Sequence, residues 1–161
     1  MADKPGLRPT PDRVRETLFN WLGQDLAGWR CLDAFAGSGA LGFEAASRGA
    51  AQVRLLERDA QLVTALCESR DRLGAQAVQV ERADALRWLA AAAPGQFDLV
   101  LLDPPFDAGL ALRAATLSAA LVVAGGFVYV ESAAPLAEVP GLDPWRQGHA
   151  GAVSFQLFRR G

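Results

Sequence analysis

The chain has 161 residues, of which 51% are hydrophobic and 21% are charged, a composition typical of one globular domain with its own core. The formal net charge of −2 excludes a globally basic nucleic-acid binder, so any contact with nucleic acid must depend on a local patch. Cys31 and Cys67 show no metal-ligand spacing, which favours a reducing, cytoplasmic location without a bound metal. No signal peptide is visible, and the longest apolar stretch is too short to cross a membrane, so we expect a soluble protein.

The first predicted element is a helix over residues 10–23, preceded by a tail at residues 1–9 that lacks apolar periodicity. Thr10 is a suitable N-cap, and Pro11 is then expected at the first helical position. Apolar side chains recur at helical spacing at Val14, Leu18 and Leu22. Gly23 is expected to end this helix.

Beyond this helix, short apolar runs alternate with helical windows. Strands are predicted at residues 31–35, 53–56, 77–80, 97–102 and 127–130. Helices are predicted at residues 40–48, 60–73, 85–93 and 110–123. Residues 145–149 and 153–158 flank a glycine-containing turn and predict a terminal antiparallel hairpin. The pattern indicates one α/β domain over residues 1–161, Rossmann-like, with a doubly wound, mostly parallel seven-stranded sheet.

A glycine-rich loop follows the first strand after the helix. Gly37, Gly39 and Gly42 have nucleotide-binding spacing and stand between a strand and a helix, where glycine allows a ligand to approach the backbone. Glu57 ends the next strand, about 20 residues after the loop, where it can accept hydrogen bonds from ribose hydroxyls. The pattern predicts a site for a nucleotide-like cofactor; the alternative is a turn that only packs helix on strand.

Carboxylates at the ends of the predicted strands help to choose the cofactor. Asp33, Glu57, Asp84 and Asp103 should meet at one edge of a parallel sheet. That edge would repel a pyrophosphate, whereas it would attract the ammonium and sulfonium of S-adenosylmethionine. For Asp84, a simple helix N-cap is an equally good interpretation.

The fourth strand leads into Asp103-Pro104-Pro105-Phe106. Consecutive prolines stiffen the backbone and donate no hydrogen bonds, so the Pro104 carbonyl is available as an acceptor. With the Asp103 carboxylate, it can hold both hydrogens of an exocyclic base amine, while Phe106 stacks on the base. We therefore predict methyl transfer to a nucleic-acid amine, with these residues as the catalytic group.

Two further segments sharpen this interpretation. Residues 6–22 (GLRPTPDRVRETLFNWL) and 32–50 (LDAFAGSGALGFEAASRGA), with the proline loop, resemble the RsmD-type family, which methylates the N2 amine of a guanine in 16S ribosomal RNA. The resemblance implies a class I methyltransferase fold and, as partner, the RNA or a small-subunit assembly particle; nothing requires more than a monomer. The family also has a basic β-hairpin before the first segment, whereas only residues 1–5 stand there. Either the gene start is short or this member docks RNA differently.

The resemblance also assigns roles to residues. It implies that the cofactor is bound by Arg8, Thr10, Asp33, Phe35, Gly37, Ser38, Gly39, Glu57, Arg58, Asp84 and Ala85. Arg13 and Arg15 would face RNA phosphates; without the resemblance, a solvated helix face shared with Asp12 and Glu16 is the favoured interpretation. Three alternatives stay open: an adenine-N6 methyltransferase, an NAD-dependent oxidoreductase, and an RNA-docking module without catalysis.

Overall fold

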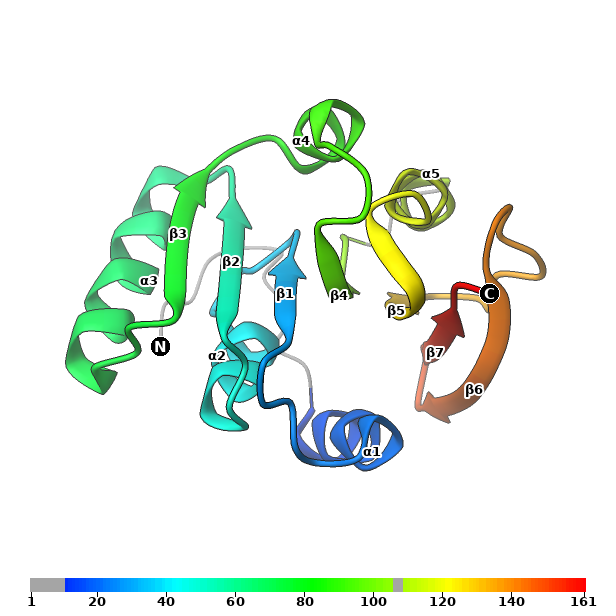
Figure 1. Cartoon of the computed structure of the whole chain (residues 1–161), viewed down its shortest axis with the longest axis horizontal. Helices are drawn as coiled ribbons and strands as arrows, with labels where there is room; N and C mark the ends of the chain where they lie inside the picture. The colour runs from blue at the N-terminus through cyan, green and yellow to red at the C-terminus, as the bar shows by residue number, and fades with distance from the viewer. Residues whose placement is uncertain (1–10, 106–108) are drawn as a thin grey trace.

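The computed structural model of the chain describes residues 11–105 and 109–161. Its strands are β1 (Arg30–Asp33), β2 (Gln52–Glu57), β3 (Val78–Arg82), β4 (Phe97–Leu102), β5 (Val122–Ser132), β6 (Asp143–Ala150) and β7 (Val153–Arg159). Its helices are α1 (Asp12–Leu22), α2 (Ala40–Ser47), α3 (Ala60–Leu73), α4 (Ala85–Ala91) and α5 (Leu110–Ser118). The strands form one seven-stranded sheet in the order β3-β2-β1-β4-β5-β7-β6 (Figure 1).

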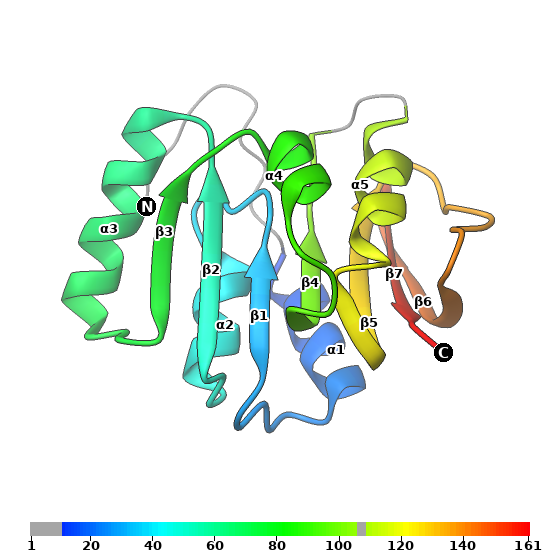
Figure 2. The same ribbon diagram turned by 45° about the horizontal axis from the view of Figure 1, so that its top comes forward.

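The sheet is parallel except at its last two strands. β1 pairs in parallel with both β2 and β4, so the strand order reverses between these two neighbours. β7 pairs antiparallel with β5 and with β6, as expected for a C-terminal hairpin. The arrowheads of β1, β2 and β3 point to the same edge, at the top of Figure 2. The predicted fold class is confirmed, and the reversal places a ligand site at the carboxyl edge beside β1.

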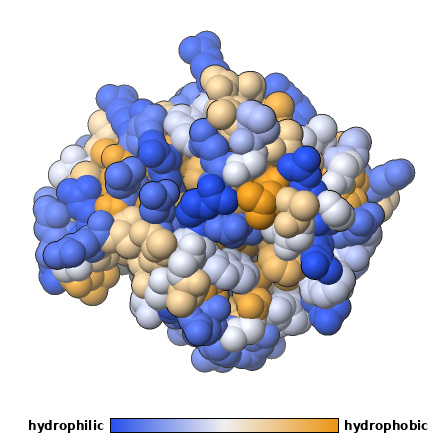
Figure 3. Space-filling model, in the orientation of Figure 1, coloured by the Kyte–Doolittle hydropathy of each residue, from blue (hydrophilic) through white to orange (hydrophobic). Residues whose placement is uncertain are grey.

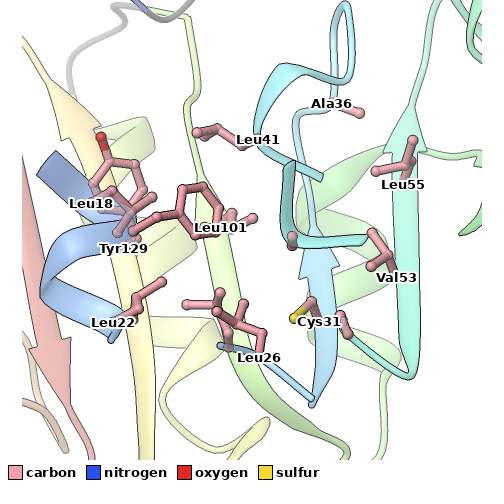
Figure 4. Close-up of a cluster of buried hydrophobic side chains, with 14 of the residues drawn as sticks. Leu18, Leu22, Leu26, Cys31, Ala36, Leu41, Val53, Leu55, Leu101 and Tyr129 are labelled. Atoms are coloured by element: carbon pink, nitrogen blue, oxygen red, sulfur yellow. The ribbon is translucent and has the colours of Figure 1, made fainter. Parts of the chain in front are cut away.

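Two apolar clusters hold helices on the two faces of the sheet. α1, α2 and α3 cover one face, and α4 and α5 cover the other (Figure 1). Alternate residues of β4 supply both clusters, Leu99 and Leu101 on the first face and Val100 and Leu102 on the second. Figure 4 shows part of the first cluster. Complete burial of such side chains stabilises the fold by about 1.5–3 kcal/mol each.

The start of α1 differs by one residue from the prediction. Pro11 has φ −58° and ψ 145°, an extended conformation, so it is the N-cap and Asp12 begins the helix. The predicted cap, Thr10, lies outside the described residues. Gly23 ends the helix in the left-handed conformation with φ 95°, as predicted.

The prediction for the α5–β5 segment was wrong at its boundary. The helix was expected to continue to residue 123, but α5 ends at Ser118 and β5 begins at Val122. The pairing register between β4 and β5 shifts at this point, and Gly126 lies so close to its neighbours that a Cβ there would be 3.1 Å from the Asp98 carbonyl oxygen. The glycine pair is therefore an irregularity within a long strand.

The surface carries no dominant apolar face in the orientation of Figure 3, where hydrophobic residues lie scattered among hydrophilic ones. Within residues 11–105 and 109–161, no helix combines the length and the hydrophobicity needed to span a bilayer.

Candidate active site

A cavity of about 350 Å³ lies at the carboxyl edge, where β1 separates β2 from β4. Most of the predicted site residues line it: Asp33, Phe35, Gly37, Ser38, Glu57, Arg58, Asp84, Ala85, Asp103, Pro104 and Pro105. Gly39 is not part of the wall but is the N-cap of α2. Arg8, Thr10 and Phe106 lie outside the described residues. The volume is within the range of small-molecule sites.

Glu57, at the end of β2, holds the glycine loop through a hydrogen bond. Its Oε1 accepts a hydrogen bond from the Gly37 backbone N–H at 3.1 Å, and its Oε2 accepts one from the Asp59 N–H at 2.8 Å. Asp59 in turn caps α3 by accepting from the N–H groups of Gln61 and Leu62. Each carboxylate oxygen has a second lone pair, so Glu57 can still accept hydrogen bonds from a ligand in the cavity.

The glycine loop ends in a tight turn at Gly39. This residue has φ 84°, and a Cβ built on it would lie 2.6 Å from the Phe43 ring and 2.8 Å from the Leu66 side chain. The turn requires glycine for both reasons, because a larger residue would be strained and would clash.

Replacing Gly39 with alanine should therefore destabilise the protein by about 2–4 kcal/mol, from left-handed strain plus overpacking. Gly74→Ala is the matched control, because Gly74 also has positive φ (64°) but no atom lies within 4 Å of an added Cβ. Only the strain of about 1–2 kcal/mol is expected there. Urea unfolding of both variants measures the difference. Equal losses of unfolding free energy in the two variants would show that steric contacts of the added Cβ at Gly39 do not destabilise the protein.

Asp33 is the most deeply buried acid of the cavity wall, with 2% of its surface exposed. The pKa of its carboxyl is raised to about 7, mainly by burial and then by the nearby Asp103, Glu131 and Glu57, with the Gly42 N–H acting in the opposite direction. That N–H donates to Asp33 Oδ2 at 3.1 Å. A cation in the cavity would favour the ionised carboxylate.

The other acids occupy different environments. Asp103 follows β4 and is half-buried, Pro104 is buried, and Pro105 is exposed. Asp84 caps α4 by accepting from the Arg87 N–H at 3.1 Å, which confirms the capping interpretation, and it also lines the cavity. No group of three potential metal ligands occurs among the described residues.

The two arginines predicted to face RNA lie on α1, outside the cavity wall. Arg13 is exposed. Arg15 forms ion pairs with Asp12 at 2.9 Å and with Glu44 of α2 at 3.4 Å. Arg15 therefore links two helices, and its guanidinium is already partly neutralised.

The sequence prediction missed several residues that complete the wall. These are Ala34, Ala36, Ala40, Leu41, Leu56, Ala83, Leu86, Leu110 and Arg113. Most flank a strand end or the start of a helix, so the fold class would have indicated them. Arg113 lies in the first turn of α5 and has no ion pair within residues 11–105 and 109–161. Arg113 and Arg58 are thus cations in a wall that also carries the carboxylates of Asp33, Glu57, Asp84 and Asp103.

The strand order, with an acid-lined cavity where that order reverses, is that of the class I methyltransferases. The structure of magnesium protoporphyrin IX methyltransferase from Synechocystis PCC 6803, solved with bound SAM, is similar in fold, with a TM-score of 0.73. It covers 92% of this chain and 79% of that one at 17% identity, so it shows the fold alone.

The chain belongs to the family described as Conserved hypothetical protein 95, whose model matches residues 1–159. It is 41% identical to Ribosomal RNA small subunit methyltransferase D of Escherichia coli (strain K12), over 99% of this chain and 83% of the relative. The structure of a putative methyltransferase, yhhF from Escherichia coli, matches with a TM-score of 0.88 and 40% identity, over 98% of this chain and 89% of that one. The resemblance to the RsmD-type family is confirmed.

Proposed function

We propose that this protein transfers a methyl group from S-adenosylmethionine to the exocyclic N2 amine of a guanine in small-subunit ribosomal RNA. The observation that carries the proposal is that Asp103 and its two prolines line the same cavity as Asp33 and Glu57. The family supports the substrate, because the Escherichia coli relative is named as a methyltransferase of the small ribosomal subunit RNA.

The cofactor site follows from the charges of the cavity. Ionised Asp33 attracts the ammonium of the methionine part, and Glu57 accepts hydrogen bonds from the ribose hydroxyls. Asp84 and Ala85, where α4 begins, would hold the adenine. The acids fit a cation far better than a pyrophosphate, which weighs against an NAD-dependent oxidoreductase.

When bound, S-adenosylmethionine supplies an electrophilic methyl group on its sulfonium. The Asp103 carboxylate and the Pro104 carbonyl each accept a hydrogen bond from one N–H of the amine. These two hydrogen bonds orient the nitrogen lone pair toward that methyl group. A nitrogen–carbon bond forms as the carbon–sulfur bond breaks. Asp103 or water then accepts the proton that leaves the nitrogen, and the Asp103 charge stabilises the positive charge developing there.

The direct test is transfer of labelled methyl from S-adenosylmethionine to under-methylated 16S ribosomal RNA and, in parallel, to under-methylated small-subunit particles. Mass spectrometry of the nucleosides is expected to show N2-methylguanosine. Exclusive formation of N6-methyladenosine would replace guanine by adenine as the substrate. RNA binding without any methyl transfer would indicate that the protein is an RNA-docking module without catalytic activity. Calorimetry should detect binding of S-adenosylmethionine to the protein. Tight binding of NAD in its place would refute the proposal of a methyltransferase.

A further inference from the structure

Among the buried polar side chains of β5, Tyr129 and Glu131 form a pair that the proposed mechanism does not use. Tyr129 and Glu131 are both 0% exposed. The Tyr129 hydroxyl donates a hydrogen bond to Glu131 Oε2 at 2.8 Å. A buried carboxylate is costly unless hydrogen bonds hold it, so a pair of this kind needs an explanation in function or in folding.

The strand register brings this pair close to Asp103, which follows β4. Leu101 of β4 lies opposite Tyr129, and Leu102 lies opposite Val130. When this register is continued by one residue past the end of β4, Asp103 falls opposite Glu131, and neighbouring strands lie about 4.8 Å apart. Because side chains alternate between the faces, Asp103 and Glu131 share the face of Leu101 and Tyr129. Figure 4 shows the Tyr129 hydroxyl directed toward the carboxyl end of β5.

The charges of these groups act on one another. Burial is the main cause that raises the pKa of both the Asp33 carboxyl and the Tyr129 hydroxyl, and Glu131 and Asp103 raise both pKa values further. Among the described residues, the elements packed on this face present apolar side chains to the pair: Leu18 from α1, Leu41 from α2, and Phe155 and Leu157 from β7. An apolar surrounding screens charge less than water does, so the charges of Glu131 and Asp103 act on one another within this face.

We propose that Glu131, held by Tyr129, is a positioning residue that places a buried negative charge behind Asp103 and thereby accelerates methyl transfer. Glu131 is not part of the cavity wall, so it acts through Asp103 and not on the base. Its charge makes Asp103 a better proton acceptor and stabilises the positive charge that develops on the amine nitrogen. This inference rests on the proposed function.

The test compares Glu131→Gln and Tyr129→Phe with Asp98→Asn. Glutamine keeps the shape and an acceptor oxygen for Tyr129 but removes the charge. Asp98 is the control, because it is a carboxylate near the opposite end of the neighbouring strand β4 and accepts from the Arg30 backbone N–H at 2.8 Å. The control should lose some stability and keep its kcat.

For Glu131→Gln, we expect kcat to fall by about tenfold, less than the ~10²–10³-fold loss for a group that touches the transition state. KM for RNA and Kd for S-adenosylmethionine should stay within about twofold, since neither ligand touches Glu131. The acidic limb of the kcat–pH profile should move to lower pH, because a carboxyl group ionises more easily once a negative neighbour is removed. Tyr129→Phe should shift kcat in the same direction by a smaller factor.

A purely structural role predicts a different result. In that case Glu131→Gln and Tyr129→Phe lower the melting temperature, and kcat and its pH profile match those of the wild type once the protein is folded. That result would overturn the inference and leave the proposed function intact. Absence of methyl transfer by the wild-type protein would instead refute the proposed function itself. Should Glu131→Gln fail to fold, Tyr129→Phe decides by the same pH profile.

Discussion

Asp103→Asn is expected to lower kcat by about 10³-fold while S-adenosylmethionine still binds. Asparagine preserves the size of the side chain and one acceptor oxygen, but it can neither take the amine proton nor stabilise a positive nitrogen. Asp103 is one of the groups that raise the pKa of Asp33, so its neutralisation should, if anything, favour the ionised Asp33 that attracts the cofactor. Single-turnover transfer of labelled methyl to RNA measures the chemical step, and calorimetry measures cofactor affinity.

Pro104→Ala tests how much the stiffness of the backbone after Asp103 contributes to kcat. It keeps the Asp103 charge and the backbone carbonyl but removes the ring that stiffens the turn, so we expect a smaller loss in kcat than for Asp103→Asn. An Asp103→Asn enzyme that retains more than a tenth of wild-type kcat would show that the carboxylate is not the group acting on the amine.

The strand-end acids could be predicted because parallel strands end at one edge of a sheet. Asp33, Glu57 and Asp103 each stand at or next to the end of a short apolar run, and the fold brings them to one cavity. Once the alternation of strands and helices is recognised, no knowledge of packing is needed to place them. The same argument accounts for Asp84, which follows β3.

Glu131 could not be predicted in this way. The sequence analysis placed the fifth strand at residues 127–130, whereas β5 spans Val122–Ser132. Which residue of β4 lies beside Glu131 depends on the register shift near Asp98, and the glycine pair that accompanies this shift looks like a simple break in the sequence. A boundary error of two residues therefore hid the carboxylate that neighbours Asp103.

Arg15 shows a similar limit. Its pairing with Asp12, three residues earlier, is readable from helical spacing. Its pairing with Glu44 joins two helices far apart in the chain, and only the packing of α1 beside α2 produces it. Sequence alone therefore leaves the role of this arginine open between RNA and protein contacts.

Asp33 should make both stability and cofactor affinity depend on pH. Its pKa is about 7 in the folded protein against an ordinary value of 3.8, so the folded state binds the proton more tightly than the unfolded chain does. The stabilisation from this proton is fully present below 3.8 and is lost as the pH rises through about 7. The difference between these pKa values corresponds to about 4 kcal/mol.

Asp33→Asn isolates this contribution, because asparagine keeps an oxygen for the Gly42 N–H and never ionises. Without ligand, the variant should become progressively more stable than the wild type between pH 4 and pH 8, by up to about 4 kcal/mol. Urea unfolding at several pH values measures the difference in unfolding free energy between the variant and the wild type. The contributions of the other titrating groups are the same in both proteins and cancel in this difference. A difference that does not change with pH would mean that Asp33 is ionised throughout.

The same proton couples to cofactor binding in the wild-type protein. The ammonium of S-adenosylmethionine favours the ionised carboxylate, so binding should release about one proton below pH 7, and affinity should rise about tenfold per pH unit until it levels there. Calorimetry in buffers of different ionisation enthalpy counts the released protons. Asp33→Asn should bind more weakly at pH 8 and show no such release, which separates the charge of Asp33 from its shape. Equal proton release by the variant and the wild type would assign the coupling to another acid of the cavity.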